Sequence, residues 1–279
     1  MGDMLFLEGL RVDGDGIFGS PARNEAQSTE MELRERVAQE TYDDYLGRIA
    51  RHHSVPVMDH EVRRFVNDIP DGGVICDIGG CWGWHWRDLH AYRPDVTVVI
   101  VDFIKSNLYH AMKHLGPAIG RNVWLVHGDA TALEFPDRSF DGYWSVQTLQ
   151  HVPVLETAIA EAVRVLKSGG SFASYSLNNS RLFEAAFRIM GRDYITDGEV
   201  PGQYYLRRAA AGEARVIADI FGAPVTTRFS EILFKPELRL SFSGRPATWV
   251  GRLDACLSGG SVLLAPLARQ RSFHTRKPG

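Results

Sequence analysis

The residues best suited to bind a ligand lie close together between positions 73 and 86, in the stretch GVICDIGGCWGWHW. An apolar run over 74–78 follows the turn signal Asp71-Gly72-Gly73, and this pattern predicts a buried parallel strand. Three glycines come next, where the strand gives way to a helix, so backbone N–H groups can face a ligand there. They are Gly79, Gly80 and Gly83. Asp77 cannot bind phosphate, but its carboxylate can receive an ammonium group, which predicts a ligand with a cationic part.

Two nucleotide-binding loops can be compared with this spacing. The dinucleotide fingerprint G-x-G-x-x-G, started at Gly79, requires glycine where the chain has Cys81 and Trp84. The D-x-G-x-G-x-G loop of S-adenosylmethionine (SAM) dependent methyltransferases is matched by Asp77, Gly79 and Gly83, and the chain departs from it only at Cys81. The sequence therefore resembles the class I methyltransferase family, which implies SAM as cofactor. The residue at 81 then governs how closely the loop approaches the methionine part of SAM.

A second acid stands at the end of the next predicted strand, over 96–103. Asp102 lies 25 positions after Asp77 (102 minus 77), close to the roughly 20-residue offset at which an acid reaches nucleotide ribose hydroxyls in a β-α-β unit. A carboxylate offers the two acceptors that vicinal hydroxyls need. The resemblance implies that Asp102 binds the SAM ribose and that Phe103 lies near the adenine. The alternative for Asp102 is a cap for the helix from Ser106 onward.

The third and fourth predicted strands, over 123–127 and 140–147, also end in family-like segments. After the third strand, Asp129 and Ala130 match the positions that contact the adenine amino group and a ring nitrogen in the family, although Asp129 could instead cap a turn. The segment SFDGYWSVQTLQHVP resembles the family's SFDxVxSxxxLHHV and places Gln147 at the carboxyl edge of its strand. His151 is the candidate catalytic base because its ordinary pKa suits neutral pH, or else it only caps or fills the next helix. The cofactor-binding residues implied by the resemblance, which covers about 71–235, are Asp77, Gly79, Gly80, Cys81, Gly83, Asp102, Phe103, Asp129, Ala130 and Gln147.

Composition narrows the class of protein. With 279 residues and 44% hydrophobic content, the chain can bury a sizeable core. A net charge of −3 gives no overall electrostatic footprint for nucleic acid, which we do not expect as a partner. The three cysteines form neither a disulfide framework nor a metal-ligand spacing, and no apolar run approaches the ~18 residues of a membrane-spanning helix. We therefore expect a cytoplasmic protein without a transmembrane segment.

Residues 1–70 are predicted to form a flexible leader and an N-terminal helical cap. Residues 1–28 lack periodicity, whereas 29–52 and 56–69 carry apolar residues at helical intervals. The resemblance suggests that such a cap closes over the ligands, with Tyr42 and Tyr45 as lid residues. Packing on the domain is the alternative for both tyrosines.

The rest of the chain predicts an α/β fold with a seven-stranded, mostly parallel, doubly wound sheet that has helices on both faces and an antiparallel last strand. Residues 71–240 form the SAM-binding domain, in which 153–167 and 203–221 are predicted helices and 225–229 with 232–234 are the antiparallel pair that ends the sheet. The region over 178–202 interrupts the alternation, and we interpret it as a lid insertion that determines acceptor specificity.

Residues 241–279 are left as a C-terminal extension. Trp249, Leu253, Leu257 and the run over 262–267 can pack as an extra helix, form a partner surface or touch a membrane. The basic tail over 269–279 is expected to be solvated.

These features favour a methyltransferase that uses in-line displacement on a small-molecule acceptor, such as a natural product, a sugar or a lipid-like compound, with transfer to oxygen slightly preferred. No N-P-P-Y segment and no Pro-Cys nucleophile follows the fourth strand, which weakens the hypothesis of a nucleic-acid acceptor. A SAM-fold protein that binds cofactor or a partner without catalysis is the alternative, and a nicotinamide-dependent reductase is disfavoured by Cys81 and Trp84. The acceptor and the oligomeric state are left open.

Overall fold

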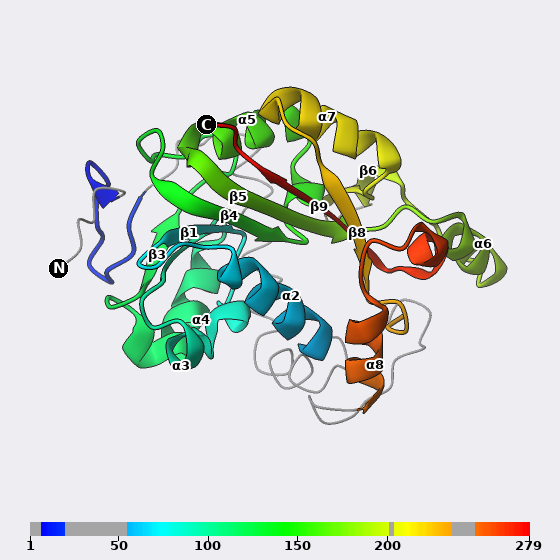
Figure 1. The fold of residues 1–279 in the computed structure, drawn as a ribbon, viewed down its shortest axis with the longest axis horizontal. Coiled ribbons are helices and arrows are strands. Elements are labelled where there is room, and N and C mark those ends of the chain that lie inside the picture. Colours follow the sequence, from blue (N-terminus) through cyan, green and yellow to red (C-terminus); the bar gives the residue numbers. More distant parts are fainter. Residues whose placement is uncertain (1–6, 20–54, 201–203, 236–248) are drawn as a thin grey trace.

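The computed structural model describes residues 7–19, 55–200, 204–235 and 249–279, and its main element is one seven-stranded sheet (Figure 1). The strand order is β3-β2-β1-β4-β5-β9-β8, and only β9 runs antiparallel to its neighbours. The strands are β1 (Val74–Ile78), β2 (Thr97–Asp102), β3 (Val123–His127), β4 (Phe140–Val146), β5 (Leu166–Leu177), β8 (Thr226–Ser230) and β9 (Gln270–Arg276). The predicted seven-stranded, mostly parallel fold with an antiparallel last strand is confirmed.

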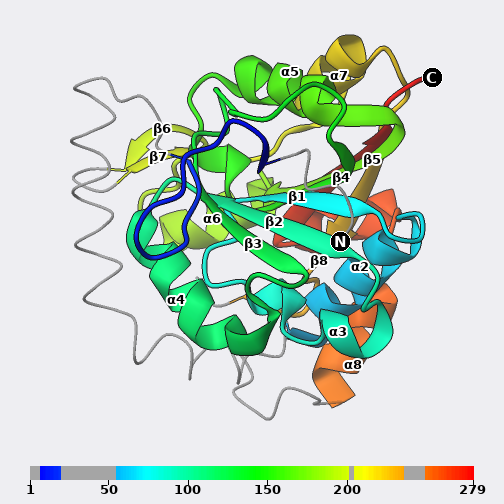
Figure 2. The same cartoon turned by 90° about the vertical axis from the view of Figure 1, so that its left-hand side faces the viewer.

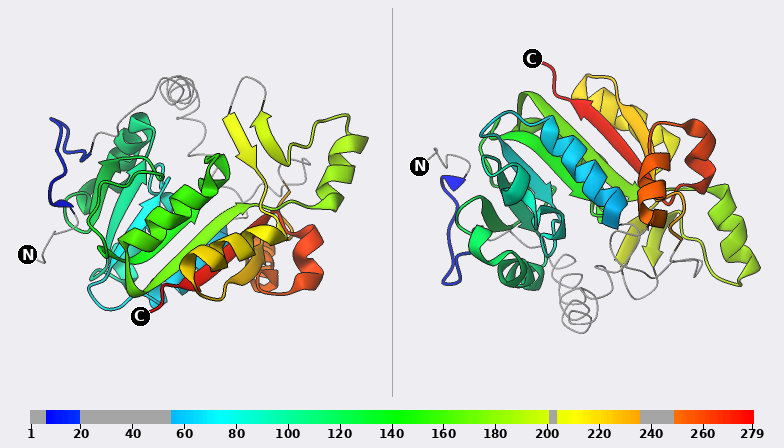
Figure 3. Two further views of the ribbon diagram at one scale, coloured as in Figure 1. Left: turned by 90° about the horizontal axis from the view of Figure 1, so that it is seen from above. Right: turned by 60° about the horizontal axis from the view of Figure 1, so that its bottom comes forward.

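Helices cover both faces of this sheet, as Figure 3 shows from two directions. One face carries α2 (Val55–Asn67), the short η2 (Trp84–Trp86) and α3 (Leu89–Tyr92), and α4 (Lys105–Leu115). The other face carries α5 (Leu155–Val165) and α7 (Ala211–Phe221). The remaining helices are η3 (Gly116–Ala118), η4 (Leu149–His151), α6 (Arg181–Ile189), α8 (Trp249–Leu257) and η6 (Val262–Leu267). No helix in the described ranges is long and apolar enough to cross a membrane.

The alternation of side chains along each strand divides the core into two clusters. Ile75 of β1 belongs to the cluster under α2 and α4, whereas its neighbour Cys76 belongs to the cluster under α5 and α7. Because both of their faces are buried, β1 and β2 are nearly continuous apolar runs that end near an acid. Gly142 of β4 lets α2 approach the sheet, since a Cβ there would lie 2.6 Å from Ile69 Cδ1 and 3.1 Å from Phe65 Cζ.

The last strand comes from a different part of the chain than we predicted. The predicted strand over 225–229 is present as β8, but 232–234 forms no strand, and β9 is inserted between β5 and β8 instead. The expectation of a solvated tail is thus wrong for Gln270–Arg276. Phe273 is 1% exposed, and pairing on both sides satisfies the backbone of the strand, so its basic residues do not keep it in solvent. The sheet therefore extends past residue 240.

The insertion after β5 contains a helix and a hairpin. Its hairpin consists of β6 (Asp197–Val200) and β7 (Tyr204–Arg207), which pair antiparallel. The predicted helix over 203–221 accordingly begins later, at Ala211.

Part of the predicted leader is packed against the sheet. Phe18 bridges to Val126 of β3, and its N–H donates to the Leu125 carbonyl over 2.9 Å (Figure 2). Ile17 is fully buried beside it. The expected flexibility is therefore wrong for residues 7–19. The predicted helix over 29–52, with Tyr42 and Tyr45, lies outside the described residues, whereas the second predicted helix is present as α2.

Candidate active site

The candidate residues from four strands meet at one edge of the sheet. β1, β2, β3 and β4 run parallel and adjacent, so the segments that follow their carboxyl ends lie side by side (Figure 2). The loop after β1 crosses toward β2, because the Gly79 N–H donates to the Val101 carbonyl over 2.7 Å. This edge is where open α/β sheets bind ligands.

Asp77 is a buried carboxyl group beneath the glycine loop, with 1% of its surface exposed. The indole Nε1 of Trp86 donates to Asp77 Oδ2 over 2.6 Å. Burial, and secondarily the charge of Asp102, raises the pKa of Asp77 to about 7 against the opposing effect of the Trp86 bond. The group is therefore poised between its neutral and charged forms at neutral pH, and a cation beside it would favour the charged form.

All three glycines of the loop are required by close packing. A Cβ on Gly80 would lie 2.2 Å from Asp77 Oδ2, and one on Gly79 would lie 2.0 Å from Thr148 Oγ1. Gly83 would place a Cβ 2.4 Å from Leu115 Cδ1. Gly79 and Gly83 also have a φ of 68°, which side chains disfavour. The loop thus brings backbone directly against the buried carboxyl group.

Cys81 keeps the backbone conformation that a glycine would adopt. Its φ is 51°, in the left-handed region, at a cost of about 1 kcal/mol for a residue with a Cβ. Its N–H donates to Asp102 Oδ2 over 3.0 Å, which ties the loop to the end of β2. Burial raises the pKa of the Cys81 thiol, so the side chain stays neutral. The departure from glycine therefore preserves the path of the loop and adds a half-buried thiol to it.

Asp102 accepts several hydrogen bonds at the end of β2. Besides Cys81, the N–H of Ile104 donates to Oδ1 over 2.8 Å, and Asn107 Nδ2 donates to Oδ1 over 3.1 Å. These bonds hold the segment that leads into α4, but its N-cap residue is Ile104 and no side chain caps the helix, so the capping alternative for Asp102 is wrong, while ribose binding stays a prediction. The backbone carbonyl of Phe103 lies 3.2 Å from His127 Nε2, so Phe103 also lies at this edge.

The segments after β3 and β4 complete the edge. Asp129 Oδ1 accepts hydrogen bonds from the N–H and hydroxyl of Thr131 over 2.8 and 2.7 Å, which is the turn-capping alternative, and Ala130 is 9% exposed beside it. Gln147 has a φ of 53°, and its N–H donates to the Tyr175 carbonyl over 2.7 Å. A left-handed turn therefore directs the chain away from β4 at the candidate site. Adenine contact by Asp129 and Ala130 stays a prediction.

His151 links the turn after β4 to the hairpin. Its Nδ1 lies 2.8 Å from the carbonyl oxygen of Tyr205, and because a carbonyl only accepts, Nδ1 carries the proton. Its Nε2 lies 3.1 Å from Gln150 Nε2, while Gln150 Oε1 accepts the Leu177 N–H over 2.8 Å. The Gln150 amide therefore donates to Nε2. Both ring nitrogens are engaged, which supports the alternative that His151 positions the chain, and its catalytic role stays a prediction.

Sequence reasoning missed His85 beside this site. Its ring meets that of Trp144 edge-on, with centroids 6.0 Å apart. Burial, with a smaller effect of the Arg87 charge, lowers the pKa of His85 to about 4, so the imidazole is neutral. It lies in the aromatic stretch directly after the glycine loop, and that position is the only signal the sequence offers for it.

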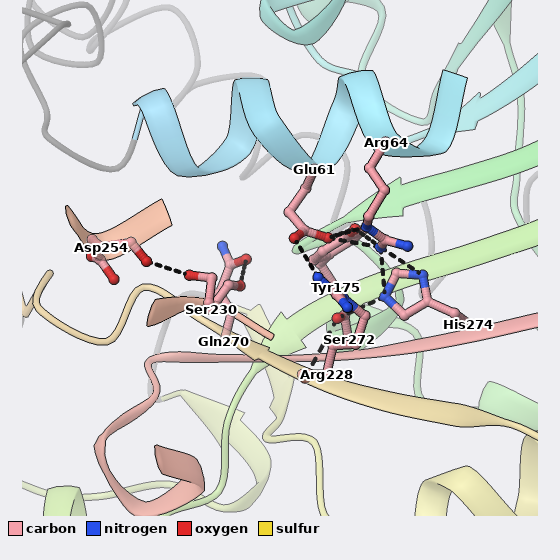
Figure 4. A network of polar contacts seen from close by, with 10 residues as sticks. Glu61, Arg64, Tyr175, Arg228, Ser230, Asp254, Gln270, Ser272 and His274 are labelled. Atoms are coloured by element: carbon pink, nitrogen blue, oxygen red, sulfur yellow. Dashed lines mark hydrogen bonds and ion pairs between the residues drawn. The ribbon is translucent and has the colours of Figure 1, made fainter. Parts of the chain in front are cut away.

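A buried polar network joins α2 to β5, β8 and β9 on the same face of the sheet (Figure 4). Glu61 accepts hydrogen bonds from the Tyr175 hydroxyl over 2.7 Å, from Arg64 over 2.8 Å and from Arg228 over 3.2 Å. Burial would raise the pKa of Glu61, but the two arginines and the hydrogen bonds outweigh it and bring the pKa to about 2. Burial, together with Arg64, lowers the pKa of His274 to about 3. The signal in the sequence is an acid on the apolar face of a helix.

Comparison with known proteins identifies one family for the central part of the chain. Residues 76–174 match the family described as "Methyltransferase domain". A ubiquinone/menaquinone biosynthesis C-methyltransferase of Methylobacterium nodulans is 33% identical over 119 residues, which are 40% of this chain and 47% of that protein. A sterol 24-C-methyltransferase of Eremothecium gossypii is 33% identical over 157 residues, 53% of this chain and 40% of that protein. The chain thus spans less than half the length of these relatives.

Solved structures share the fold at low sequence identity. An SAM-dependent methyltransferase from Thermotoga maritima superposes with a TM-score of 0.56 at 17% identity, covering 88% of this chain and 99% of that one. A phosphoethanolamine N-methyltransferase of Haemonchus contortus, in complex with SAM, gives a TM-score of 0.52 at 18% identity and covers 78% of this chain and 52% of that one. Residues 76–174 thus match a methyltransferase domain, and the sheet around them has the fold of the solved SAM-dependent methyltransferases.

Proposed function

We propose that this protein transfers a methyl group from SAM to a small, lipid-like acceptor. The observation that carries the proposal is the buried Asp77 carboxyl group beneath a glycine loop at the carboxyl edge of the sheet. Its pKa of about 7 suits an ammonium partner, because such a group can replace the proton that the carboxyl holds at lower pH. The amino group of SAM supplies this chemistry, whereas a pyrophosphate would be repelled.

The remaining cofactor contacts follow from the same edge. SAM supplies an electrophilic methyl group on its sulfonium, so the protein mainly has to orient the acceptor and exclude water. Asp102, held at 6% exposure by its N–H donors, is assigned to the ribose hydroxyls. The polypeptide around Asp129 and Ala130 is assigned to the adenine, and Gln147 to the boundary between cofactor and acceptor.

The insertion after β5 is the proposed acceptor-specificity element. Arg207 of β7 donates to the carbonyls of Leu149 and Val152, each over 2.9 Å, and His151 donates to Tyr205. These bonds fasten the hairpin to the turn that follows β4. A change in the hairpin would therefore be transmitted to the acceptor side of the site.

The acceptor class rests on the relatives' names, which specify quinone and sterol chemistry. An apolar acceptor that includes a ring has this chemistry. Oxygen is the acceptor atom that we predicted from the sequence, whereas the relatives are named as C-methyltransferases. Product analysis by NMR after transfer of a ¹³C-labelled methyl group decides between the two atoms.

Calorimetric titration with SAM and S-adenosylhomocysteine, with NADH as control, tests the cofactor. We expect micromolar binding of both sulfur ligands and none of NADH. Labelled methyl transfer to quinols, phenols and sterols then tests catalysis. Binding without transfer to any of these acceptors would favour the non-catalytic SAM-fold alternative, and absence of binding would refute the proposal.

A further inference from the structure

Exposed apolar side chains concentrate on two segments that lie far apart in the sequence. One is α6 with the residue after it, and the other is η6. We call these segments together the α6–η6 ledge. Its exposed members, with their exposed fractions, are Leu182 (50%), Ile189 (87%), Met190 (40%), Val262 (74%), Leu263 (89%) and Leu267 (41%). Six exposed large apolar side chains on two segments exceed the scattered exposure that is ordinary for a protein.

The two segments of the ledge are fastened to each other by polar bonds on their inner side. Ser180 Oγ, directly before α6, donates to the Pro266 carbonyl over 2.7 Å. Asn178 Nδ2 donates to the carbonyls of Ala265 and Ala268 over 2.8 and 3.0 Å. α6 and η6 are accordingly neighbours in Figures 1 and 3. These hydrogen bonds therefore hold the two segments of the ledge next to each other.

The ledge lies at the same edge of the sheet as the candidate active site. α6 follows Leu177, the last residue of β5, and η6 precedes Gln270, the first residue of β9. Leu177 and Gln270 are paired in the sheet, and because β9 is antiparallel, both segments leave at the carboxyl end of β5. A ligand held against the ledge would therefore meet the edge that carries the glycine loop.

The faces of α6 are suited to a lipid surface. Phe183 and Phe187 are buried, whereas Leu182 and Ile189 lie seven residues apart and thus share the outward face. Arginines border that face, and residues 181–193 contain three arginines against two acids. Arg188 pairs with Glu184 over 3.2 Å, but its side chain is 78% exposed and stays available to solvent or to a headgroup. An outward apolar face bordered by arginine is typical of helices that lie in a membrane interface.

The shape of the ledge favours a bilayer over a groove-forming protein. α6 projects at one end of the longest axis of the molecule, opposite the segment over 7–19 (Figure 1). A projecting apolar helix can enter the headgroup region, and the excess of arginine complements anionic lipid. We infer that the α6–η6 ledge docks the protein on an anionic lipid bilayer, from which a lipid-like acceptor reaches the site. The inference rests on the proposed function for the nature of that acceptor.

Vesicle sedimentation tests the inference with the full chain. The vesicles contain phosphatidylcholine and phosphatidylglycerol at roughly two to one, with phosphatidylcholine alone for comparison. We expect the protein to sediment with the mixed vesicles. Ile189→Asp and Leu263→Asp should each lower the bound fraction by a factor on the order of ten. Val12→Asp is the matched control, because Val12 is 57% exposed at the other end of the molecule, and this variant should bind as the unchanged protein does.

Two outcomes would overturn the inference. The unchanged protein does not sediment with either vesicle, or the ledge variants sediment as well as Val12→Asp. Light scattering tests whether the ledge instead joins two copies of this chain. If the unchanged protein forms a dimer that Ile189→Asp dissociates, and does not bind vesicles, bilayer docking is refuted. Melting temperature and SAM titration of each variant show that the fold and cofactor site are intact. If the unchanged protein does not bind SAM, the proposed function is refuted. If a ledge variant loses vesicle binding but still binds SAM, the change concerns the ledge alone.

Discussion

We expect the affinity for SAM to depend on pH, because Asp77 gains and loses a proton near neutral pH. The substitution Asp77→Asn should remove this dependence. In the free protein its pKa is about 7, so only about a tenth of the molecules carry the charged form at pH 6. If that form receives the SAM ammonium, affinity should fall up to tenfold per pH unit below 7. Above about pH 8 the ligand amine loses its own proton. We therefore expect the tightest binding between these values.

Replacement by Asn keeps an acceptor for the Trp86 indole but removes the titration. Asp77→Asn should weaken SAM binding by about 1 to 3 kcal/mol, the magnitude of a lost charge-assisted bond, and abolish the decline toward acid pH. Calorimetry at three pH values, in buffers of different ionisation enthalpy, measures both affinity and the protons released. Asp219→Asn, on an exposed ion pair of α7, is the control and should change neither. A flat profile for the unchanged protein, or an unaltered profile in Asp77→Asn, would refute the reasoning.

Although Asp77→Asn should weaken SAM binding, it should stabilise the folded protein at alkaline pH. The native pKa of Asp77 lies above the ordinary value of 3.8, so the native state holds the extra proton between 3.8 and about 7. Stability from this group is complete below 3.8 and is lost as the pH rises through 7. The loss reaches up to about 4 kcal/mol, from roughly three pKa units. Asp77→Asn avoids it, so we expect a higher melting temperature than the unchanged protein at pH 8. A lower melting temperature would show that the buried carboxylate is compensated by another group.

Four further substitutions test the site and its support. Gly80→Ala should abolish measurable SAM binding, because its Cβ would lie 2.2 Å from Asp77 Oδ2; calorimetry that finds unchanged affinity would show that the loop can shift. Asp102→Ala should weaken SAM binding by roughly 1 to 3 kcal/mol, and equal affinity would remove its ribose role. His151→Ala should lower turnover while SAM affinity stays the same. If the residual rate of the variant keeps the pH dependence of the unchanged protein, His151 is a positioning residue and not the base. Glu61→Gln removes the buried charge that faces two half-buried arginines, so urea unfolding at pH 7 should show a loss of about 1 to 3 kcal/mol. The difference in free energy of unfolding between the unchanged protein and Glu61→Gln should shrink as the pH falls from 4.5 to about 2, because the Glu61 carboxylate is protonated first in the unfolded chain. The same difference at both pH values would contradict the stabilising role of the network.

Local signals in the sequence were sufficient for the parallel half of the fold. Strands 74–78 and 97–102 are buried on both faces, so they read as continuous apolar runs that need no knowledge of their partners. Glycine loops and strand-end acids also reveal themselves by type and spacing. Asp77, Asp102 and Asp129 were therefore named from the sequence, and the structure places all three where parallel strands end at one edge of the sheet.

Only the tertiary structure decided the rest. β9 has the sequence of a basic, polar tail, and it becomes an interior strand, next to the edge strand β8, because β5 and β8 each offer unpaired backbone groups to it. Tyr204–Arg207 forms a strand because β6 pairs with it, although the residues shortly after it form the helix α7. The pKa of Asp77 likewise depends on the burial that surrounding helices impose, and the partners of His151 and Glu61 come from segments that only folding brings near. Composition and spacing fix which groups can do chemistry, while pairing and burial determine which of them are free to do it.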